Sequence, residues 1–364
     1  MIIIGFDIGG ANIKAVKIGV YDNQLTILHT IREYFPVWIR GKKGLEEKLR
    51  KLKRVVIGEG AEQYRVAICM TAELSDTYRI KREGVEHVVK ASMDAFSDAM
   101  DIGFVSYEMK LVTGYEAVRN YTKIAGANWA ASAWLLERNS YRWGIENSVF
   151  VDVGSTTTTI IPIVSGRVYV RGFTDVEKLI VGELVYTGVL RSNVVGIVNS
   201  VPIKGFYARV CNERFALVGD VHLVLGNISS DSYTTETADG RGTSVYEAAE
   251  RLSRIVCGDV ELLNSFEIRE IARYIYEMQI ATVFSALMQI RSYIASLGID
   301  PSSFTVVSAG IGGFLVGEAA KRAGFKTVVD VDSLAGPGVS AVLPAYAAAV
   351  MMYQEGVDSY EVGS

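Results

Sequence analysis

Cysteine and histidine are scarce in this sequence, with three of each among 364 residues. An odd, small number of cysteines fits a reducing cytosol and argues against a framework of disulfide bonds. Cys211, His222 and Cys257 have neither the CxxC nor the HxxxH spacing that is typical of zinc sites. We therefore expect buried thiols at these cysteines rather than a metal centre built on sulfur.

The sequence also lacks an excess of positive charge. Its 37 Lys and Arg residues against 41 Asp and Glu residues give a net charge of −4. This balance gives no electrostatic reason to expect nucleic acid or a membrane surface as a partner. An anionic substrate would then need local recruitment by backbone dipoles, a metal ion or a few basic residues.

No segment has the length and composition of a membrane span or a signal peptide. The start of the chain has no basic region before its apolar residues. The apolar run over residues 341–352 is too short to cross a bilayer and contains Pro344 and Tyr346. We therefore expect a cytoplasmic protein with no membrane partner; the sequence does not predict its oligomeric state.

Two glycine-rich turns each follow a short apolar strand that ends in an aspartate, and the aspartates are 145 positions apart (152 − 7). Glycine lets a backbone approach a ligand closely, and the backbone N–H groups and hydroxyls of such a turn can face an anion. Two such turns predict two similar half-domains that face one cleft. The candidate phosphate-binding residues are Gly9, Gly10, Asn12 and Lys14 after Asp7, and Gly154, Ser155, Thr156 and Thr157 after Asp152.

The remaining pattern predicts alternating strands and helices in two α/β domains. We expect one domain over residues 1–146 with a returning helix in 340–364, and a second over 147–339. A buried strand over 66–70 would deliver Glu73 and Asp76 to its carboxyl end, where ligand contacts gather in α/β sheets. Other expected strands cover 14–20, 25–34, 104–110, 149–152 and 159–163, and expected helices cover 44–56, 84–100, 128–137, 243–256, 268–294 and 341–352.

A third glycine-rich turn follows a strand that starts at residue 305, and it contains Gly310, Gly312 and Gly313. Three such turns in this order resemble the actin-like ATPase and sugar-kinase superfamily. The resemblance implies two ribonuclease-H-like domains around a central cleft, with phosphates at the first two turns. It also implies that the third turn contacts a nucleotide or another substrate. The first and last thirds resemble the hydantoinase and oxoprolinase branch in particular.

A closer resemblance covers nearly the whole chain. Segments 70–76, 127–133, 182–189, 212–216, 237–240 and 251–254 are similar to the archaeal and methylotroph family of tetrahydromethanopterin-linked one-carbon transfer pathway proteins. That resemblance implies a role in methanofuran biosynthesis, with 5-(aminomethyl)-3-furanmethanol diphosphate and the phenolic amine γ-glutamyltyramine as substrates and diphosphate as the leaving group. The family usually has an aspartate where this chain has Thr159, and this departure weakens an ATP-hydrolysis interpretation more than diphosphate binding.

A diphosphate leaving group needs its growing negative charge neutralised, and Mg²⁺, backbone N–H groups and a lysine can do this. Asp7 and Asp152 are the candidates to hold Mg²⁺ through water, and Lys14 is a candidate to reach a phosphate. Their alternative roles are turn formation beside glycine and an ordinary surface lysine. ATP is a possible ligand that this chemistry does not require.

The acceptor phenol has a pKa of about 10, so a nearby carboxylate would help to remove its proton. Glu73 and Asp76 are the candidates, with helix capping or recognition of an ammonium group as the alternatives. Asp239, followed by Gly240, is a candidate for the substrate-facing wall of the second domain, or else a simple turn residue.

Two other functions remain open from the sequence. One is an ATP-dependent small-molecule kinase or a hydantoinase/oxoprolinase-like amide hydrolase that uses the same turns. The other is a nucleotide-sensing scaffold that opens and closes on a ligand without chemistry. All three predict a phosphate at the glycine-rich turns, and they differ in the ligand and in whether a product forms.

Overall fold

The computed structural model describes residues 1–58 and 63–361, with side chains described up to residue 354. The chain forms two compact units. Unit 1 comprises Met1–Glu146, Ile163–Ile180 and Asp332–Ser364, and unit 2 comprises Asn147–Pro162 and Val181–Val331. Residues 163–180 and 332–339 thus pack with unit 1, although the sequence placed them in the second domain. The assignment of each unit as an actin-like domain stays a prediction, and residues 362–364 lie outside the described part.

Unit 1 is built on a six-stranded mixed sheet in the order β3-β2-β1-β4-β5-β6. The central strands β1 (Ile2–Ile8), β4 (Tyr64–Met70) and β5 (Asp101–Ser106) are parallel to one another. The outer strands β2 (Asn12–Tyr21), β3 (Gln24–Tyr34) and β6 (Lys110–Val112) are antiparallel to their neighbours. The parallel strands bring the carboxyl ends of β1 and β4 to the same edge of the sheet.

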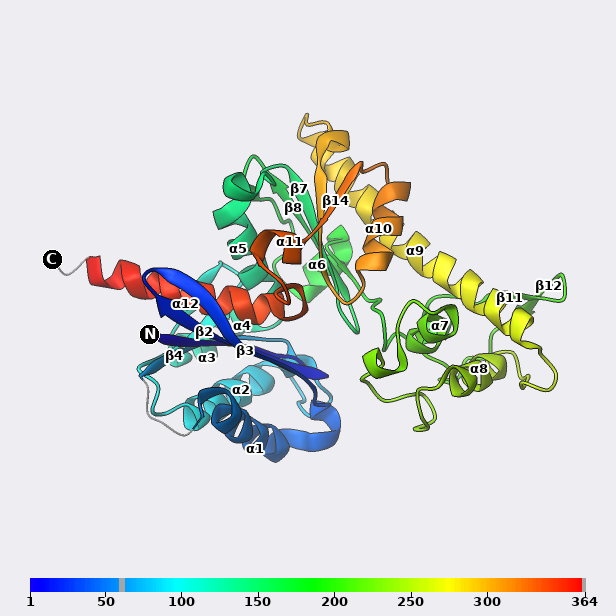
Figure 1. The fold of residues 1–364 in the computed structure, drawn as a ribbon, viewed down its shortest axis with the longest axis horizontal. Helices are drawn as coiled ribbons and strands as arrows, with labels where there is room; N and C mark the ends of the chain where they lie inside the picture. The colour runs from blue at the N-terminus through cyan, green and yellow to red at the C-terminus, as the bar shows by residue number, and fades with distance from the viewer. Residues whose placement is uncertain (59–62, 362–364) are drawn as a thin grey trace. The chain divides into compact units, whose positions relative to one another are not determined.

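Alternate side chains of β1 face opposite layers of unit 1, as the period of two requires. Ile2, Ile4, Phe6 and Ile8 belong to a core formed with α1 (Val37–Ile57) and α2 (Lys81–Ala95). On the opposite face, a Cβ added to Gly5 would lie 1.8 Å from the backbone oxygen of Ala345 in α12 (Leu343–Glu361). Only glycine permits this approach, so α12 lies directly on the sheet, as Figure 1 shows in red over blue.

Several predicted elements of unit 1 differ from the structure in their bounds, including the helices 44–56 and 128–137, which are the longer α1 and α5 (Asn128–Trp143). The predicted strand 104–110 is two strands, because the chain reverses at Met109, which has a φ of 58°. The predicted helix 84–100 is α2, which starts three residues earlier and ends at Ala95. The predicted helix 341–352 is α12, which extends further along the chain and packs against α5. The smaller helices of this unit are α3 (Gly114–Arg119) and α4 (Tyr121–Ile124). The helices α6 (Asp175–Val181) and α11 (Val331–Ala335) also belong to it except for one residue each, Val181 and Val331, which fall in unit 2.

The second sheet has the order β10-β8-β7-β13-β14, with β9 paired to β8. Its strand β7 (Ser148–Val153) is parallel to β13 (Thr305–Gly310), which is parallel to β14 (Thr327–Asp330). The remaining strands are β8 (Thr158–Val164), β9 (Arg167–Val168) and β10 (Leu184–Val185). Thr159 lies opposite Leu184 in the β8–β10 pair.

The long helix α9 (Ser265–Ser296) packs against two separate parts of unit 2 (Figure 1). It packs against α10 (Gly313–Arg322) beside β13. Its first half also joins a separate hydrophobic core with α7 (Val218–Leu225), α8 (Val245–Arg254) and the hairpin of β11 (Ser200–Ile203) and β12 (Phe206–Arg209). Within the described residues, no helix combines the length and the apolar character that a membrane crossing requires.

Candidate functional site

The first glycine-rich turn joins β1 to β2 and is closed by one backbone hydrogen bond. The N–H of Gly9 donates to the carbonyl oxygen of Asn12 at 2.9 Å. A Cβ on Gly9 would lie 2.8 Å from that oxygen, so the turn requires glycine. The sequence predicted that the Gly9 N–H faces an anion, but this N–H is engaged inside the turn.

Asp7 lies just before this turn with 4% of its surface exposed. It pairs in register with Lys14 across β1 and β2, and the Lys14 Nζ lies 3.5 Å from the Asp7 Oδ2. The Asn128 Nδ2, at the start of α5, lies 3.5 Å from the other carboxylate oxygen. Both contacts are long, so the carboxylate is oriented by weak partners from two elements.

The second turn, between β7 and β8, repeats the same closure. The N–H of Gly154 donates to the carbonyl oxygen of Thr157 at 2.9 Å. Each turn therefore starts two residues after its aspartate and closes three residues later. As in the first turn, this glycine N–H is used within the turn and does not face a ligand.

A returning segment packs against the second turn. The N–H groups of Val189 and Arg191 donate to the carbonyl oxygens of Gly154 and Ser155 at 3.0 and 2.9 Å. A Cβ on Gly188 would lie 2.5 Å from the backbone nitrogen of Thr156 and 2.6 Å from the carbonyl carbon of Ser155. Gly188 therefore lets this segment lie flat on the turn.

A chain of hydrogen-bonded polar side chains within unit 2, buried except for Asn227, holds the returning segment in place. The Gln279 side-chain amide donates to the Thr187 hydroxyl and to the Gly188 carbonyl, both at 2.9 Å. The Gln279 Oε1 lies 3.0 Å from the His222 Nε2, and the Asn227 amide nitrogen lies 3.2 Å from the His222 Nδ1. Burial lowers the pKa of His222 to about 3, although the Gln279 hydrogen bond opposes the shift. The imidazole is therefore neutral at neutral pH.

The third turn lies against the second aspartate. Gly310 has a φ of +81°, and a Cβ there would lie 2.4 Å from the Asp152 Oδ1. The Gly312 N–H donates to the Val153 carbonyl at 3.1 Å, and this residue also has no space for a side chain. Gly313 starts α10 and has open space around it. The structure thus brings Asp152, the second turn and the third turn together in unit 2.

Glu73 lies in the short turn after β4 and is 2% exposed. Neither carboxylate oxygen has a hydrogen bond of normal geometry in the described part of the chain. Burial raises the pKa of Glu73 to about 8, and the negative charge of Asp175 adds to the shift. The Glu73 amide, the Lys81 charge and the Gly126 amide oppose it only in part. Glu73 is therefore mainly protonated at neutral pH, whereas Asp76 on the same loop is exposed.

Two basic residues that the sequence did not indicate, Lys81 and Lys178, form close contacts within unit 1. The Lys81 Nζ forms an ion pair of 2.8 Å with Asp175. The Lys178 Nζ, with 2% of the residue exposed, lies 3.7 Å from the ring centroid of Trp129. Because segment 163–180 joins unit 1 through tertiary packing, no local sequence signal indicated these contacts.

Asp239 belongs to an arginine network in the α7–α8 region of unit 2. Its carboxylate bonds the side chains of Arg241, Arg251 and Arg254 at 2.8, 3.1 and 3.0 Å. Partial burial raises the pKa of Asp239, but the Arg241 and Arg254 hydrogen bonds outweigh it and hold the pKa well below its usual range. Arg251 is fully buried and also pairs with Asp220 at 2.8 Å. Asp239 therefore stabilises this region, and a ligand role for it stays a proposal.

The expectation of buried thiols is wrong for one of the pair in this region. Cys257 is exposed and Cys211 is half-buried, because they lie in loops rather than in the core. Their sulfur atoms are 3.2 Å apart. Cys69 on β4 is buried, as expected.

The described residues contain no group of three or more His, Cys, Asp and Glu side chains that could hold a metal. The carboxylates of the described residues therefore do not form a metal site whose ligands all come from the protein. They fit Mg²⁺, which commonly uses one or two carboxylates and takes its other ligands from water and substrate phosphates. Asp7 in unit 1 and Asp152 in unit 2 each offer one such carboxylate, and Mg²⁺ binding by either stays a proposal.

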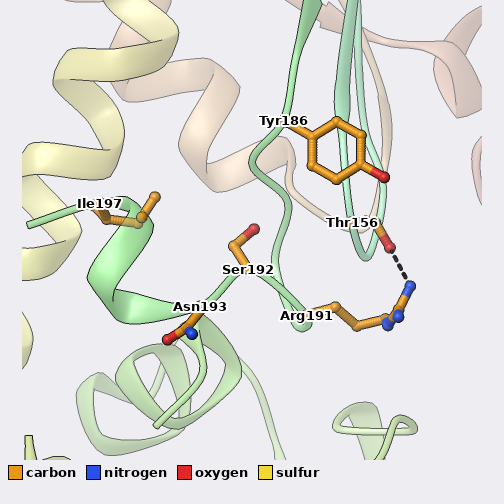
Figure 2. Close-up of a pocket in the computed structure, with 7 residues that line it drawn as sticks. Thr156, Tyr186, Arg191, Ser192, Asn193 and Ile197 are labelled. Carbon is orange, nitrogen blue, oxygen red and sulfur yellow. Dashed lines mark hydrogen bonds between the residues drawn. The ribbon is translucent and has the colours of Figure 1, made fainter. Parts of the chain in front are cut away.

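A pocket of about 240 Å³ adjoins the second turn (Figure 2). Arg191 reaches from the returning segment and donates to the Thr156 hydroxyl at 3.2 Å. Arg191 was not predicted from the sequence, because it is 35 positions from Thr156 and carries no motif of its own. The pocket is lined by Thr156, Tyr186, Arg191, Ser192, Asn193, Gly196 and Ile197.

Comparison with known proteins gives the fold and the relatives. The chain is 30% identical over 355 residues, 98% of each chain, to a Methanocaldococcus jannaschii protein named (4-{4-[2-(gamma-L-glutamylamino)ethyl]phenoxymethyl}furan-2-yl)methanamine synthase. A Methanococcus vannielii protein of the same name is 28% identical over 213 residues, which are 58% of this chain and 92% of that protein.

Among solved structures, nucleotide-free acetone carboxylase superposes with a TM-score of 0.58 at 12% identity. The match covers 95% of this chain and 70% of that one. The predicted α/β fold of the actin-like ATPase type is thereby confirmed. Residues 65–355 match the model of the hydantoinase/oxoprolinase family, so the chain belongs to the hydantoinase/oxoprolinase family.

Proposed function

We propose that this chain is an enzyme of methanofuran biosynthesis. It would condense 5-(aminomethyl)-3-furanmethanol diphosphate with γ-glutamyltyramine and release diphosphate. The observation that carries the proposal is the similarity, over 98% of both chains, to the M. jannaschii synthase whose name describes the furan–phenol ether. The substrates would therefore be small molecules.

In this reaction the bond between the furfuryl carbon and the diphosphate oxygen breaks, and the phenol oxygen bonds to that carbon as its proton leaves. The furan oxygen delocalises the positive charge that develops on the carbon. The enzyme then has to neutralise the diphosphate, exclude water and hold the phenol close. Mg²⁺, held through water by Asp7 and Asp152, would supply part of the neutralisation.

Residues of the chain itself would supply the rest. We assign Lys14 and the N–H groups and hydroxyls of Gly10, Ser155, Thr156 and Thr157 to the phosphate oxygens. The glycines Gly9 and Gly154 would act by shaping the turns, since their N–H groups are engaged there.

Glu73 is our candidate to accept the phenolic proton. Its pKa of about 8 is closer to that of a phenol than an ordinary carboxylate's, which favours proton transfer between them. Only the ionised carboxylate of Glu73 can accept a proton. The activity should therefore rise with pH as Glu73 ionises.

One incubation tests the function. Purified protein with the furfuryl diphosphate, γ-glutamyltyramine and Mg²⁺ should form the aryl ether, detected by mass spectrometry, together with one diphosphate per product. ATP turnover without the ether would favour the kinase or amide-hydrolase alternative. Ligand binding with no product from any pair would favour the nucleotide-sensing scaffold.

A further inference from the structure

The pocket beside the second turn has the charge and shape of a site for a single carboxylate. Arg191 is the one charged residue among its seven lining residues, all of which are described. A guanidinium binds a carboxylate through two parallel N–H groups, whereas a diphosphate carries more negative charge than one arginine can balance. The hydrogen bond from Arg191 to Thr156 holds the guanidinium beside the second turn (Figure 2).

The rest of the lining fits an organic arm rather than an inorganic ion. Tyr186 contributes an aromatic ring and Ile197 an aliphatic side chain on opposite parts of the wall (Figure 2). The Ser192 hydroxyl accepts from the Gly188 N–H at 2.9 Å, and the Asn193 oxygen accepts from the Val195 N–H at 3.3 Å. These bonds fix two polar side chains of the pocket and preorganise it.

We propose that this pocket binds the carboxylate of the acceptor substrate and that Arg191 determines specificity for an acceptor that carries one. The inference rests on the proposed function, because the γ-glutamyl group in the name of the M. jannaschii synthase is the part that bears a carboxylate. None of the seven lining residues is acidic, so the ammonium group of a γ-glutamyl arm points away from the wall.

Calorimetric titration tests the inference without turnover. The ligands are γ-glutamyltyramine, its analogue with a carboxamide in place of the carboxylate, tyramine and inorganic diphosphate. The wild-type protein should bind γ-glutamyltyramine about tenfold or more tightly than the carboxamide or tyramine. Arg191→Met should reduce this preference to within about threefold, and Arg191→Lys, which keeps the charge but not the fork, should be intermediate.

The matched control is Arg209→Met, which removes the same charge from an exposed position on β12 of the same unit and should keep the full preference. Equal binding of acid and carboxamide by the wild type, or an unchanged preference in both Arg191 variants, overturns the inference. So does a selective loss of diphosphate binding in Arg191→Met.

The calorimetric titration and the product assay test different claims, so one can give a negative result without the other. An Arg191-dependent carboxylate preference without ether formation would sink the proposed reaction and keep the pocket assignment. Ether formation with an Arg191→Met variant that still discriminates against tyramine would keep the proposed reaction and refute the pocket assignment.

Discussion

The side-chain amide of Gln279, in the middle of α9, donates a hydrogen bond of 2.9 Å to the backbone carbonyl of Gly188. Gly188 in turn lies against the backbone of Thr156 in the second turn. A buried side chain of a helix in unit 2 therefore helps to set the position of the residues proposed to contact phosphate. The turn depends on packing as well as on its own glycine.

Gly188→Ala should disturb this turn. The added methyl group would meet the Thr156 backbone nitrogen at 2.5 Å, so backbone must move, at a cost of about 1–3 kcal/mol. We expect a lower unfolding midpoint in denaturant and weaker diphosphate binding. Gly317→Ala in α10 is the control, because nothing lies within 4 Å and alanine favours the helix. Equal stability of the two variants would contradict this packing account.

Asp7→Asn and Asp152→Asn should each abolish ether formation and leave folding nearly unchanged. Asparagine keeps the shape of the side chain but removes the charge that we assign to Mg²⁺. Product formation by mass spectrometry and a circular dichroism melt separate the two effects. A wild-type rate in either variant would refute the metal assignment for that residue.

The pH dependence of stability should reveal Glu73. Its pKa is raised from 4.5 to about 8 in the folded protein, so the unfolded chain binds fewer protons between these values. The Glu73 contribution is therefore lost as pH rises from about 4.5 through about 8, by a few kcal/mol. Glu73→Gln should be spared this loss, whereas Glu86→Gln, at an exposed position on α2, should follow the wild type. Denaturant midpoints from pH 5 to about 9 provide the measurement.

His222 should make the folded protein less stable as the pH falls, the reverse of the Glu73 effect. Its pKa falls from 6.5 to about 3 on folding, so the unfolded chain binds more protons between these values. Stability should fall as the pH drops below about 6.5. His222→Gln should weaken that dependence while lowering stability at pH 7, since the Gln279 contact changes. If wild type and variant lose stability in parallel from pH 7 to about 4, His222 is not the responsible group.

Cys211 and Cys257 should form a disulfide under mild oxidation with diamide. Their sulfurs are 3.2 Å apart, and Cys257 is exposed to reagent. The hydrogen bond with Cys257, followed by burial, raises the pKa of Cys211, so the reaction should speed up with rising pH. Peptide mapping should show the linked pair, with Cys69 still reduced. Cys257→Ser should remove the link, and a wild-type protein that forms only intermolecular disulfides would contradict the geometry.

The elements that the sequence predicted well have strong local signals. The apolar strands before Asp7 and Asp152 and the glycines after them fixed the positions of both turns. The reversal at Met109 was missed because a methionine with positive φ gives no turn signal of the kind that Gly or Asn gives.

The missed parts of the site depend on tertiary packing. Arg191 reaches Thr156 only because the segment around Gly188 folds back on the turn. Lys178 contacts Trp129 only because the chain after β9 packs with unit 1, which places α6 beside α5. Neither event has a period or a motif that can be read from neighbouring residues.

The placement of α12 on β1 affects how the chain is made. A ribosome releases β1 first and α12 more than 300 residues later, whereas unit 2 is complete at Val331. Unit 2 can therefore fold before α12 is synthesised and covers one face of the unit 1 sheet. A nascent chain interrupted before Leu343 would present that apolar face to chaperones and proteases.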